Sequence, residues 1–121
     1  MALNANKKGK RFELKIANEL AKEFNCKIKR TPLSGGMDFK GDILCIDDNS
    51  IMSEFSWECK NQEKLNIWKA LAQSRNDAPR GTIPLVCFTK NFELDYVAIE
   101  FNDFVNIVKE LEELRNERNT K

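Results

Sequence analysis

Two acidic residues and a lysine stand at the ends of two short apolar segments of this 121-residue chain. Asp42 opens the first segment, and Glu58 and Lys60 close the second. Carboxylate oxygens can hold a divalent cation, and a lysine beside them adds a proton donor or a positive charge. The three side chains therefore have the chemistry for metal-dependent phosphodiester hydrolysis, provided that the fold brings them together.

Asp42 and Glu58 become neighbours if the two segments pair as a β-hairpin. We predict strands over residues 41–46 and 52–60, joined by a short polar turn. In a hairpin, the start of one strand lies beside the end of the next, which places Asp42 near Glu58. Glu58 and Lys60 are two positions apart and share a face of their strand. The competing interpretations are a turn aspartate at position 42 and an ordinary surface ion pair at positions 58 and 60.

The pattern acid-x-Lys occurs three times, as Glu13-Leu-Lys15, Asp38-Phe-Lys40 and Glu58-Cys-Lys60. We favour the third copy because it ends a predicted strand whose partner begins with Gly-Asp. Asp38 is a second acidic candidate, four residues before Asp42. We prefer Asp42 because an apolar strand follows it at once.

The remaining elements alternate between helical and strand patterns. Apolar spacing predicts helices over residues 7–25, 65–77 and 103–118, and strands over 26–30, 84–89 and 95–100. Asn6 is the expected cap of the first helix and Asn102 or Asp103 that of the last. The last helix should bury its apolar side, which carries Phe104, Ile107, Val108 and Leu111. The order α-β-β-β-α-β-β-α predicts an α/β fold with a mixed sheet of about five strands flanked by helices.

Length and composition indicate one domain over residues 1–121, with residues 1–6 flexible. No apolar run approaches the roughly 20 residues that span a bilayer, so we expect a cytoplasmic protein without a membrane partner. The chain has no histidine, which excludes histidine-based nucleophilic and acid-base schemes. Its four cysteines lack metal-site spacing, so we expect reduced, buried thiols. Most aromatic residues stand at core-like spacings, which favours packing over base stacking.

The net charge of +1 conceals an uneven distribution along the chain. Residues 1–30 carry nine Lys and Arg against three Glu, a balance of 9 − 3 = +6. Residues 31–121 carry eleven basic and sixteen acidic side chains, a balance of 11 − 16 = −5. The first third of the chain is therefore a candidate surface for a polyanion, and a solvated lysine-rich helix is the alternative.

Taken in order, these motifs resemble the PD-(D/E)xK nuclease superfamily, and within it the archaeal-type Holliday junction resolvases and their phage relatives. The resemblance covers roughly residues 7–75 and implies a restriction-endonuclease-like fold. The matching segments are Lys8-Gly9-Lys10-Arg11-Phe12-Glu13, Arg30, Ser34-Gly35-Gly36, Gly41-Asp42-Ile43 and Trp57-Glu58-Cys59-Lys60.

The resemblance implies a role for each matching residue. Asp42, Glu58 and the Cys59 carbonyl oxygen would bind Mg²⁺, for which Mn²⁺ could substitute, and Glu13 would complete the metal site. Lys60 would orient or deprotonate the attacking water. DNA phosphates would be met by Lys8, Lys10, Arg11 and Arg30. Ser34 would lie beside the active site, unless its loop is a simple turn, and Gln73 matches a glutamine of many members, although an exposed helix glutamine is the simpler interpretation.

The implied activity is structure-selective endonucleolytic cleavage of branched DNA, a four-way junction above all, by a homodimer with two active sites. No nucleotide cofactor is expected, and a phage-encoded member would act in the host cytoplasm. The runner-up is another nuclease of the superfamily, of the nicking or restriction type. The same residues are also compatible with a non-catalytic DNA-binding module of this fold, and the acidic last helix with a protein-interaction domain.

Overall fold

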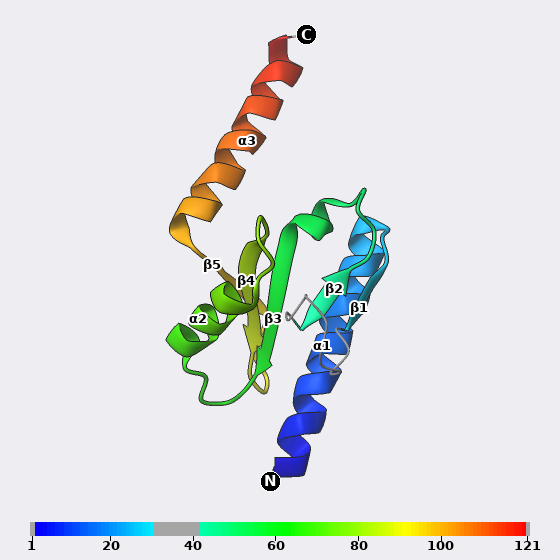
Figure 1. The fold of residues 1–121 in the computed structure, drawn as a ribbon, viewed down its shortest axis with the longest axis vertical. Helices are drawn as coiled ribbons and strands as arrows, with labels where there is room; N and C mark the ends of the chain where they lie inside the picture. Colours follow the sequence, from blue (N-terminus) through cyan, green and yellow to red (C-terminus); the bar gives the residue numbers. More distant parts are fainter. Residues whose placement is uncertain (1, 31–41, 121) are drawn as a thin grey trace.

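The computed structural model describes residues 2–30 and 42–120 of the chain. Within them, the chain forms three α-helices and a five-stranded mixed sheet (Figure 1). The strands follow their chain order across the sheet: β1 (Ile28–Arg30), β2 (Ile43–Cys45), β3 (Phe55–Asn61), β4 (Ile83–Thr89) and β5 (Tyr96–Ile99). The helices are α1 (Ala2–Phe24), α2 (Ile67–Asp77) and α3 (Phe101–Thr120). The predicted α/β architecture, a mixed sheet flanked by helices, is confirmed.

The centre of the sheet is the parallel pair β3 and β4, which α2 connects. All other neighbouring strands are antiparallel. Asn61 and Thr89, the last residues of β3 and β4, are partners in the register. Ligands of open α/β sheets bind beyond the carboxyl ends of parallel strands. This edge of the sheet is therefore where chemistry is expected.

The two faces of the sheet are covered differently. Trp57 and Cys59 of β3 pack with Phe12 and Ile16 of α1 in the main apolar core. Their neighbours in β3, Ser56 and Glu58, are also buried but point to the other face, because successive side chains of a strand alternate. On that face, α2 packs against β3 and β4. The thiols are all free, as predicted, although only Cys59 and Cys87 are fully buried.

The connection between β2 and β3 differs from the predicted hairpin. Residues Ile51–Glu54 form a 3₁₀-helix, η1, so that β3 begins at Phe55 and not at Met52. The hydroxyl group of Ser50 accepts a hydrogen bond from the Met52 N–H at 3.1 Å and caps this turn. Serine caps helical turns well because its side chain replaces a missing main-chain acceptor. This local hydrogen bond explains the later start of the strand.

Two helices also begin at other residues than predicted. α1 begins at Ala2, five residues before Lys7, so Asn6 lies inside the helix and does not cap it. α2 begins at Ile67, where the Asn66 side chain accepts a hydrogen bond from the Lys69 N–H at 3.2 Å. The asparagine cap therefore sets the start of α2 more sharply than the apolar spacing, which pointed to Leu65.

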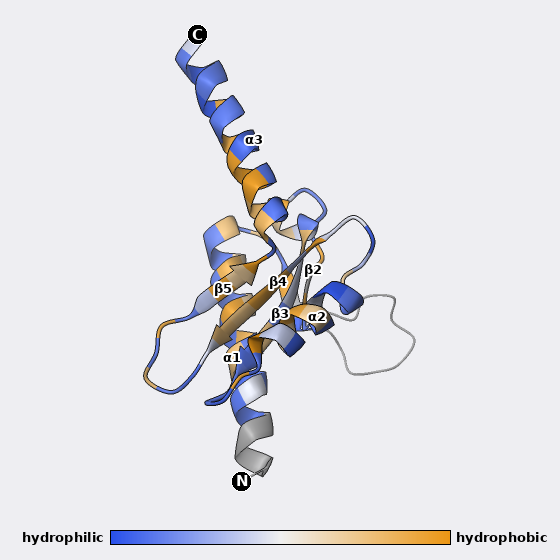
Figure 2. Cartoon of the chain, turned by 90° about the vertical axis from the view of Figure 1, so that its left-hand side faces the viewer, coloured by the Kyte–Doolittle hydropathy of each residue, from blue (hydrophilic) through white to orange (hydrophobic). Residues whose placement is uncertain are grey.

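The prediction for the last helix was wrong in its packing. α3 begins at Phe101, so that Asn102 and Asp103 lie in its first turn and do not cap it. None of its residues is buried, and the helix extends away from the sheet, with apolar residues concentrated in the half next to the body (Figures 1 and 2). Trp68 of α2 and Phe101 are likewise exposed, at 79% and 75%, and not part of the core. An amphipathic pattern shows which side of a helix is apolar, but not that its partner belongs to the same chain.

Candidate active site

Asp42 is held against the middle of β3 by two hydrogen bonds to its main chain. Its N–H donates to the carbonyl oxygen of Trp57 at 2.7 Å. Its carboxylate oxygen Oδ2 accepts from the N–H of Cys59 at 2.6 Å. The next residue, Ile43, is the register partner of Trp57. The antiparallel pairing of β2 with β3 thus brings Asp42 beside the segment that carries Glu58.

Glu58 is a buried carboxyl group without a hydrogen-bond partner in the described part of the chain. Its side chain is 1% exposed, and neither Oε1 nor Oε2 is hydrogen-bonded. Burial raises the pKa of Glu58 to about 8, and the nearby charge of Asp42 adds to this shift. The positive charge of Lys60 acts in the opposite direction. A buried carboxylate without a partner is costly, so this position favours either a proton or a bound cation.

The side chains of Lys60 and Cys59 lie on opposite faces of β3. Lys60 is half-buried and shares its face of the strand with Glu58. The Cys59 side chain lies in the core, where burial raises the pKa of its thiol, so it is not suited to act as a nucleophile. The contribution of Cys59 in this structure comes from its main-chain N–H, which holds Asp42.

Glu13 pairs with Arg30 and not with the other two acidic residues. The Arg30 Nε donates to Glu13 Oε2 at 2.8 Å, which links α1 to β1. Among residues 2–30 and 42–120, no three cysteine, aspartate or glutamate side chains gather as a group that could hold a metal ion. The structure therefore brings Asp42 and Glu58 together and leaves Glu13 in an ion pair.

The other residues singled out in the sequence either lie at the surface or fall outside the described residues. Ser34 and Asp38 lie outside the described residues. Lys10, Arg11 and Gln73 are exposed on their helices, and Lys8 is half-buried. The Lys8 Nζ pairs with Glu63 Oε2 at 3.3 Å, in the connection that follows β3.

The Asp42–Glu58 pair fits a divalent cation by its chemistry. Mg²⁺ and Mn²⁺ prefer carboxylate oxygens, and Glu58 offers two buried oxygens that no described donor occupies. A cation bound there would offset the cost of burying the charge and return the pKa of Glu58 toward its ordinary value. Glu58 therefore lacks a partner for its buried carboxyl group, and a bound metal ion would supply one.

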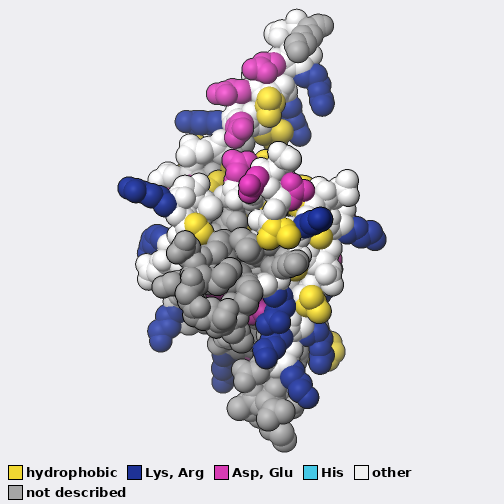
Figure 3. All heavy atoms as spheres, turned by 45° about the vertical axis from the view of Figure 1, so that its right-hand side comes forward, with side chains coloured by type: hydrophobic (Ala, Val, Ile, Leu, Met, Phe, Trp, Pro, Cys, Tyr) yellow, Lys and Arg dark blue, Asp and Glu magenta, His cyan; other side chains and the backbone are white. Residues whose placement is uncertain are grey.

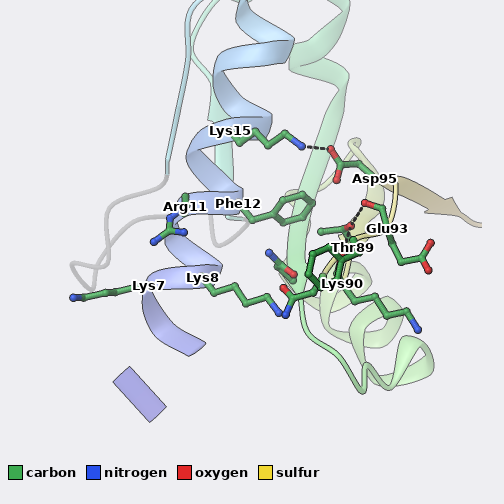
Figure 4. A pocket seen from close by; sticks show the side chains of 12 residues that line it. Lys7, Lys8, Arg11, Phe12, Lys15, Thr89, Lys90, Glu93 and Asp95 are labelled. Atoms are coloured by element: carbon green, nitrogen blue, oxygen red, sulfur yellow. Dashed lines mark hydrogen bonds and ion pairs between the residues drawn. The ribbon is translucent and has the colours of Figure 1, made fainter. Parts of the chain in front are cut away.

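A basic pocket lies next to this edge of the sheet, between α1 and the loop that joins β4 to β5 (Figure 4). It has a volume of about 490 Å³. Figure 3 shows lysine and arginine side chains over the lower part of the molecule and also around α3, whereas the acidic side chains gather mainly toward α3. Two carboxylates, of Glu93 and Asp95, also line it, and Lys15 Nζ pairs with Asp95 Oδ2 at 2.6 Å. The five cationic residues that line this pocket are Lys7, Lys8, Arg11, Lys15 and Lys90.

Two features of the basic pocket were missed in the sequence. Lys90 lies between two predicted strands, about 80 residues from the lysines of α1, and only the fold brings them to one pocket. Phe92 also lines the pocket, is fully exposed and has a φ of 65°, in the left-handed region. Its signal in the sequence is a single aromatic residue between Asn91 and Glu93, in a polar turn where the fold needs no apolar side chain.

The matching family model is described as "Phage putative PDDEXK endonuclease" and covers residues 4–120 of the chain. The chain belongs to this family. No curated protein and no solved structure matches it. The resemblance to the PD-(D/E)xK superfamily and its phage relatives is thereby confirmed, and the match extends beyond residue 75 to α3.

Membership of this PD-(D/E)xK family indicates a nuclease with a DNA substrate. Nucleases of this type generally use divalent metal ions, in agreement with the chemistry of the Asp42–Glu58 pair. In the described part of the chain, no helix is long and apolar enough to cross a membrane.

Proposed function

We propose that this PD-(D/E)xK protein is a divalent-metal-dependent, structure-selective DNA endonuclease of the Holliday junction resolvase type, with Asp42, Glu58 and Lys60 in its active site. The observation that carries the proposal is the buried, unpartnered carboxyl group of Glu58 beside Asp42. Strongly shifted carboxyl groups at the carboxyl edge of an α/β sheet are candidates for catalysis. The family match supplies the reaction class.

In this proposal, Asp42 and Glu58 hold Mg²⁺, or Mn²⁺ in its place, and the Cys59 carbonyl oxygen is a further ligand. The bound ion supplies Lewis acidity at the scissile phosphate and lowers the pKa of water. Cys59 keeps Asp42 in position through its main-chain N–H. Lys60, on the same face as Glu58, orients the attacking water and offsets negative charge that develops at the phosphate.

Glu13 has a less direct place in the proposal. In the observed arrangement it orients Arg30, whose guanidinium group would meet a phosphate near the scissile bond. The family resemblance gives Glu13 a place in the metal site. That place would require Glu13 to leave Arg30 when metal and DNA bind, and the two roles can be separated by experiment.

The DNA backbone would lie along the basic pocket, next to the carboxyl end of β3. Of the predicted phosphate contacts, Lys8 and Arg11 line this pocket together with Lys7 and Lys90, whereas Lys10 and Arg30 lie outside it. Contacts of this kind read the position of phosphates and not the base sequence. Phe92, which presents an aromatic ring beside these cations, is available to stack on an unpaired base. Ser34, which lies outside the described residues, keeps the place beside the active site that the family resemblance implies.

Selectivity for a four-way junction and a homodimeric state complete the proposal. A four-way junction is cut at two symmetry-related points, which calls for two active sites. The fold would be the restriction-endonuclease-like fold that the resemblance implies, since the mixed sheet, flanking helices and acidic pair are compatible with it.

The decisive experiment compares cleavage of a four-way junction with cleavage of linear duplex of the same sequence, with Mg²⁺, with Mn²⁺ and with EDTA. Metal-dependent cleavage of the junction alone supports the proposal. Equal cleavage of the linear duplex would indicate a nicking or restriction-type nuclease instead. Junction binding without cleavage by the wild-type protein, together with no heat of metal binding in calorimetry, would leave a non-catalytic DNA-binding module.

A further inference from the structure

An apolar stripe runs along α3 without a partner in the described part of the chain. Its residues recur at positions i, i+3, i+4, i+7 and i+10, which is the spacing of one helix face. They are 43–57% exposed, except Ile107, which is half-buried. An isolated helix with such a face is marginal in water, because most helix stability in proteins comes from packing. The members of the stripe are Phe104, Ile107, Val108, Leu111 and Leu114.

We propose that the α3 stripe is a dimerisation seam, on which α3 of a second copy of this chain docks in parallel. Phe104, Ile107, Leu111 and Leu114 alternate in steps of three and four, so they can occupy the a and d positions of a two-stranded coiled coil. Packing against a second copy would bury these four residues from each chain. Val108, at a flanking e position, would be partly covered.

The charges beside the seam favour a second copy of the same chain in a parallel arrangement. With Phe104 at position a, Glu110 is at a g position and Arg115 at the e position that follows. In a parallel pair, each g residue faces the e residue five positions later on the other helix, so Glu110 meets Arg115 twice by symmetry. In an antiparallel pair, g residues face g residues, which would bring Glu110 toward Glu117. Within one helix, Glu110 and Arg115 are too far around the axis to pair.

A second apolar surface adjoins the base of α3 and extends the seam onto the body. The pocket between α2 and the start of α3 has a volume of about 800 Å³ and is lined mainly by apolar side chains, with Trp68 and Phe101 among them. Both residues are at least 75% exposed. In a parallel pair, both bodies lie at the same end of the seam, so these surfaces approach each other. The added area matters because a seam of about two heptads is short for a coiled coil on its own.

The parallel arrangement leaves both candidate active sites accessible. β5 is antiparallel to β4, so α3 leaves the sheet at the edge opposite to the carboxyl end of β4. Asp42 is bonded to Cys59 of β3, and the basic pocket is lined by Lys7, Lys8 and Arg11 from the N-terminal half of α1. In Figure 1, β3 ends toward that half of α1, whereas α3 leaves at the opposite end. Two bodies joined through α3 would therefore present their two basic edges on the side away from the seam.

The first test is the mass of the full-length protein in solution by sedimentation velocity between 5 and 200 µM. A dimer has twice the chain mass of 14.0 kDa, or 28.0 kDa. Leu111→Glu should raise the dissociation constant at least tenfold and leave the core of the domain folded, since Leu111 lies outside it. Asn116→Glu, which adds the same charge on the outer side of α3, is the matched control and should stay dimeric. A wild-type monomer at 200 µM, or a Leu111→Glu dimer, would overturn the proposal.

The second test addresses the parallel register through a charge exchange. Glu110→Arg and Arg115→Glu should each weaken the dimer severalfold, because each places like charges across the seam. The double variant should recover the wild-type dissociation constant. If the double variant is no tighter than the single ones, the parallel register is wrong.

The seam and the nuclease activity can fail separately. A wild-type protein that is monomeric and yet cleaves DNA would contradict the seam and leave the active-site proposal in place. If the wild type is a 28.0 kDa dimer and Leu111→Glu is a monomer, but the wild type cleaves no DNA with any metal, the seam is supported and the proposed nuclease activity is contradicted.

Discussion

The main-chain N–H of Cys59 donates to the carboxylate oxygen Oδ2 of Asp42 at 2.6 Å. This bond ties the residue that precedes β2 to the residue that follows Glu58. It keeps the two carboxyl groups near each other before any ion binds. Its consequence is visible at Glu58, where burial and then the charge of Asp42 raise the pKa to about 8. The site is thus an acidic pair whose negative charge would be stabilised by a cation.

Asp42→Asn should separate the charge of Asp42 from its hydrogen bond. The amide oxygen of asparagine can still accept from the Cys59 N–H, so the melting temperature should change by less than about 3 °C. Removal of the charge should weaken Mn²⁺ binding and lower the cleavage rate at least about 100-fold. Asp42→Ala, which loses both, should cost a further ~1 kcal/mol of stability or more. Undiminished cleavage by both variants would remove Asp42 from the active site.

The pKa of Glu58 predicts how stability depends on pH. The folded protein holds a proton on Glu58 up to about pH 8, whereas the ordinary value is 4.5. The folded state therefore binds more protons between these values, and metal-free stability should fall as pH rises from about 4.5 to 8. Each unit of the shift corresponds to about 1.4 kcal/mol, so the loss should amount to a few kcal/mol.

Glu58→Gln is the control for this titration, because glutamine keeps the shape of the side chain without its charge. Its stability, measured by urea unfolding at several pH values in EDTA, should vary less between pH 5 and 8.5 than that of the wild type. Saturating Mg²⁺ should stabilise the wild type and not the variant. Parallel pH profiles for the two proteins would show that Glu58 is not the group that titrates.

The acidic pair could be predicted from the sequence because it depends on local patterns. Asp42 precedes an apolar strand and Glu58 lies near the end of another. Antiparallel pairing of these neighbouring strands then brings the two residues together. Of the aromatic residues expected to pack, Phe12 and Trp57 lie in the core, whereas Trp68 and Phe101 do not. These inferences need only the period of a strand or helix and one short connection.

The surroundings of the pair could not be predicted in the same way. Glu13 was expected at the metal, but the partner it contacts, Arg30, comes from β1. Lys90 joins the lysines of α1 in one pocket although about 80 residues separate them. The α3 stripe was expected to be buried by its own chain, because hydrophobic spacing carries no information on which surface covers it. Each miss concerns contacts between distant segments, which periodicity does not encode.

Glu13→Gln and Arg30→Lys should distinguish the two roles of Glu13. If Glu13 mainly orients Arg30, as the 2.8 Å ion pair indicates, both variants should weaken junction binding by a similar factor of about two to ten. Their Mn²⁺ affinities should then equal that of the wild type. A selective loss of metal affinity in Glu13→Gln, measured calorimetrically with junction DNA present, would place Glu13 in the metal site instead.

The basic pocket should determine how binding responds to salt. Neutralising a lysine that contacts a phosphate lowers the slope of log K against log salt by about one. We expect this change for Lys7→Gln and for Lys90→Gln, with similar losses for junctions of different sequence. Lys69→Gln is a suitable control, because Lys69 is exposed on α2 and does not line the pocket. Fluorescence anisotropy at four salt concentrations would measure the slopes, and identical slopes for all four proteins would exclude the pocket as the DNA surface.

Phe92 should contribute to DNA binding through its ring and not through the fold. The residue is fully exposed, so Phe92→Ala removes no core packing and should leave the melting temperature unchanged or slightly higher. Loss of a stacked base contact costs about 1–3 kcal/mol, which corresponds to roughly a 5- to 150-fold weaker complex. The effect should be largest for DNA with unpaired bases at the branch point and should be recovered in Phe92→Trp. Leu94→Ala is the matched control, since Leu94 is 73% exposed in the same loop and lines a neighbouring pocket instead. Equal affinities of Phe92→Ala and Leu94→Ala for branched DNA would show that the ring does not stack on a base.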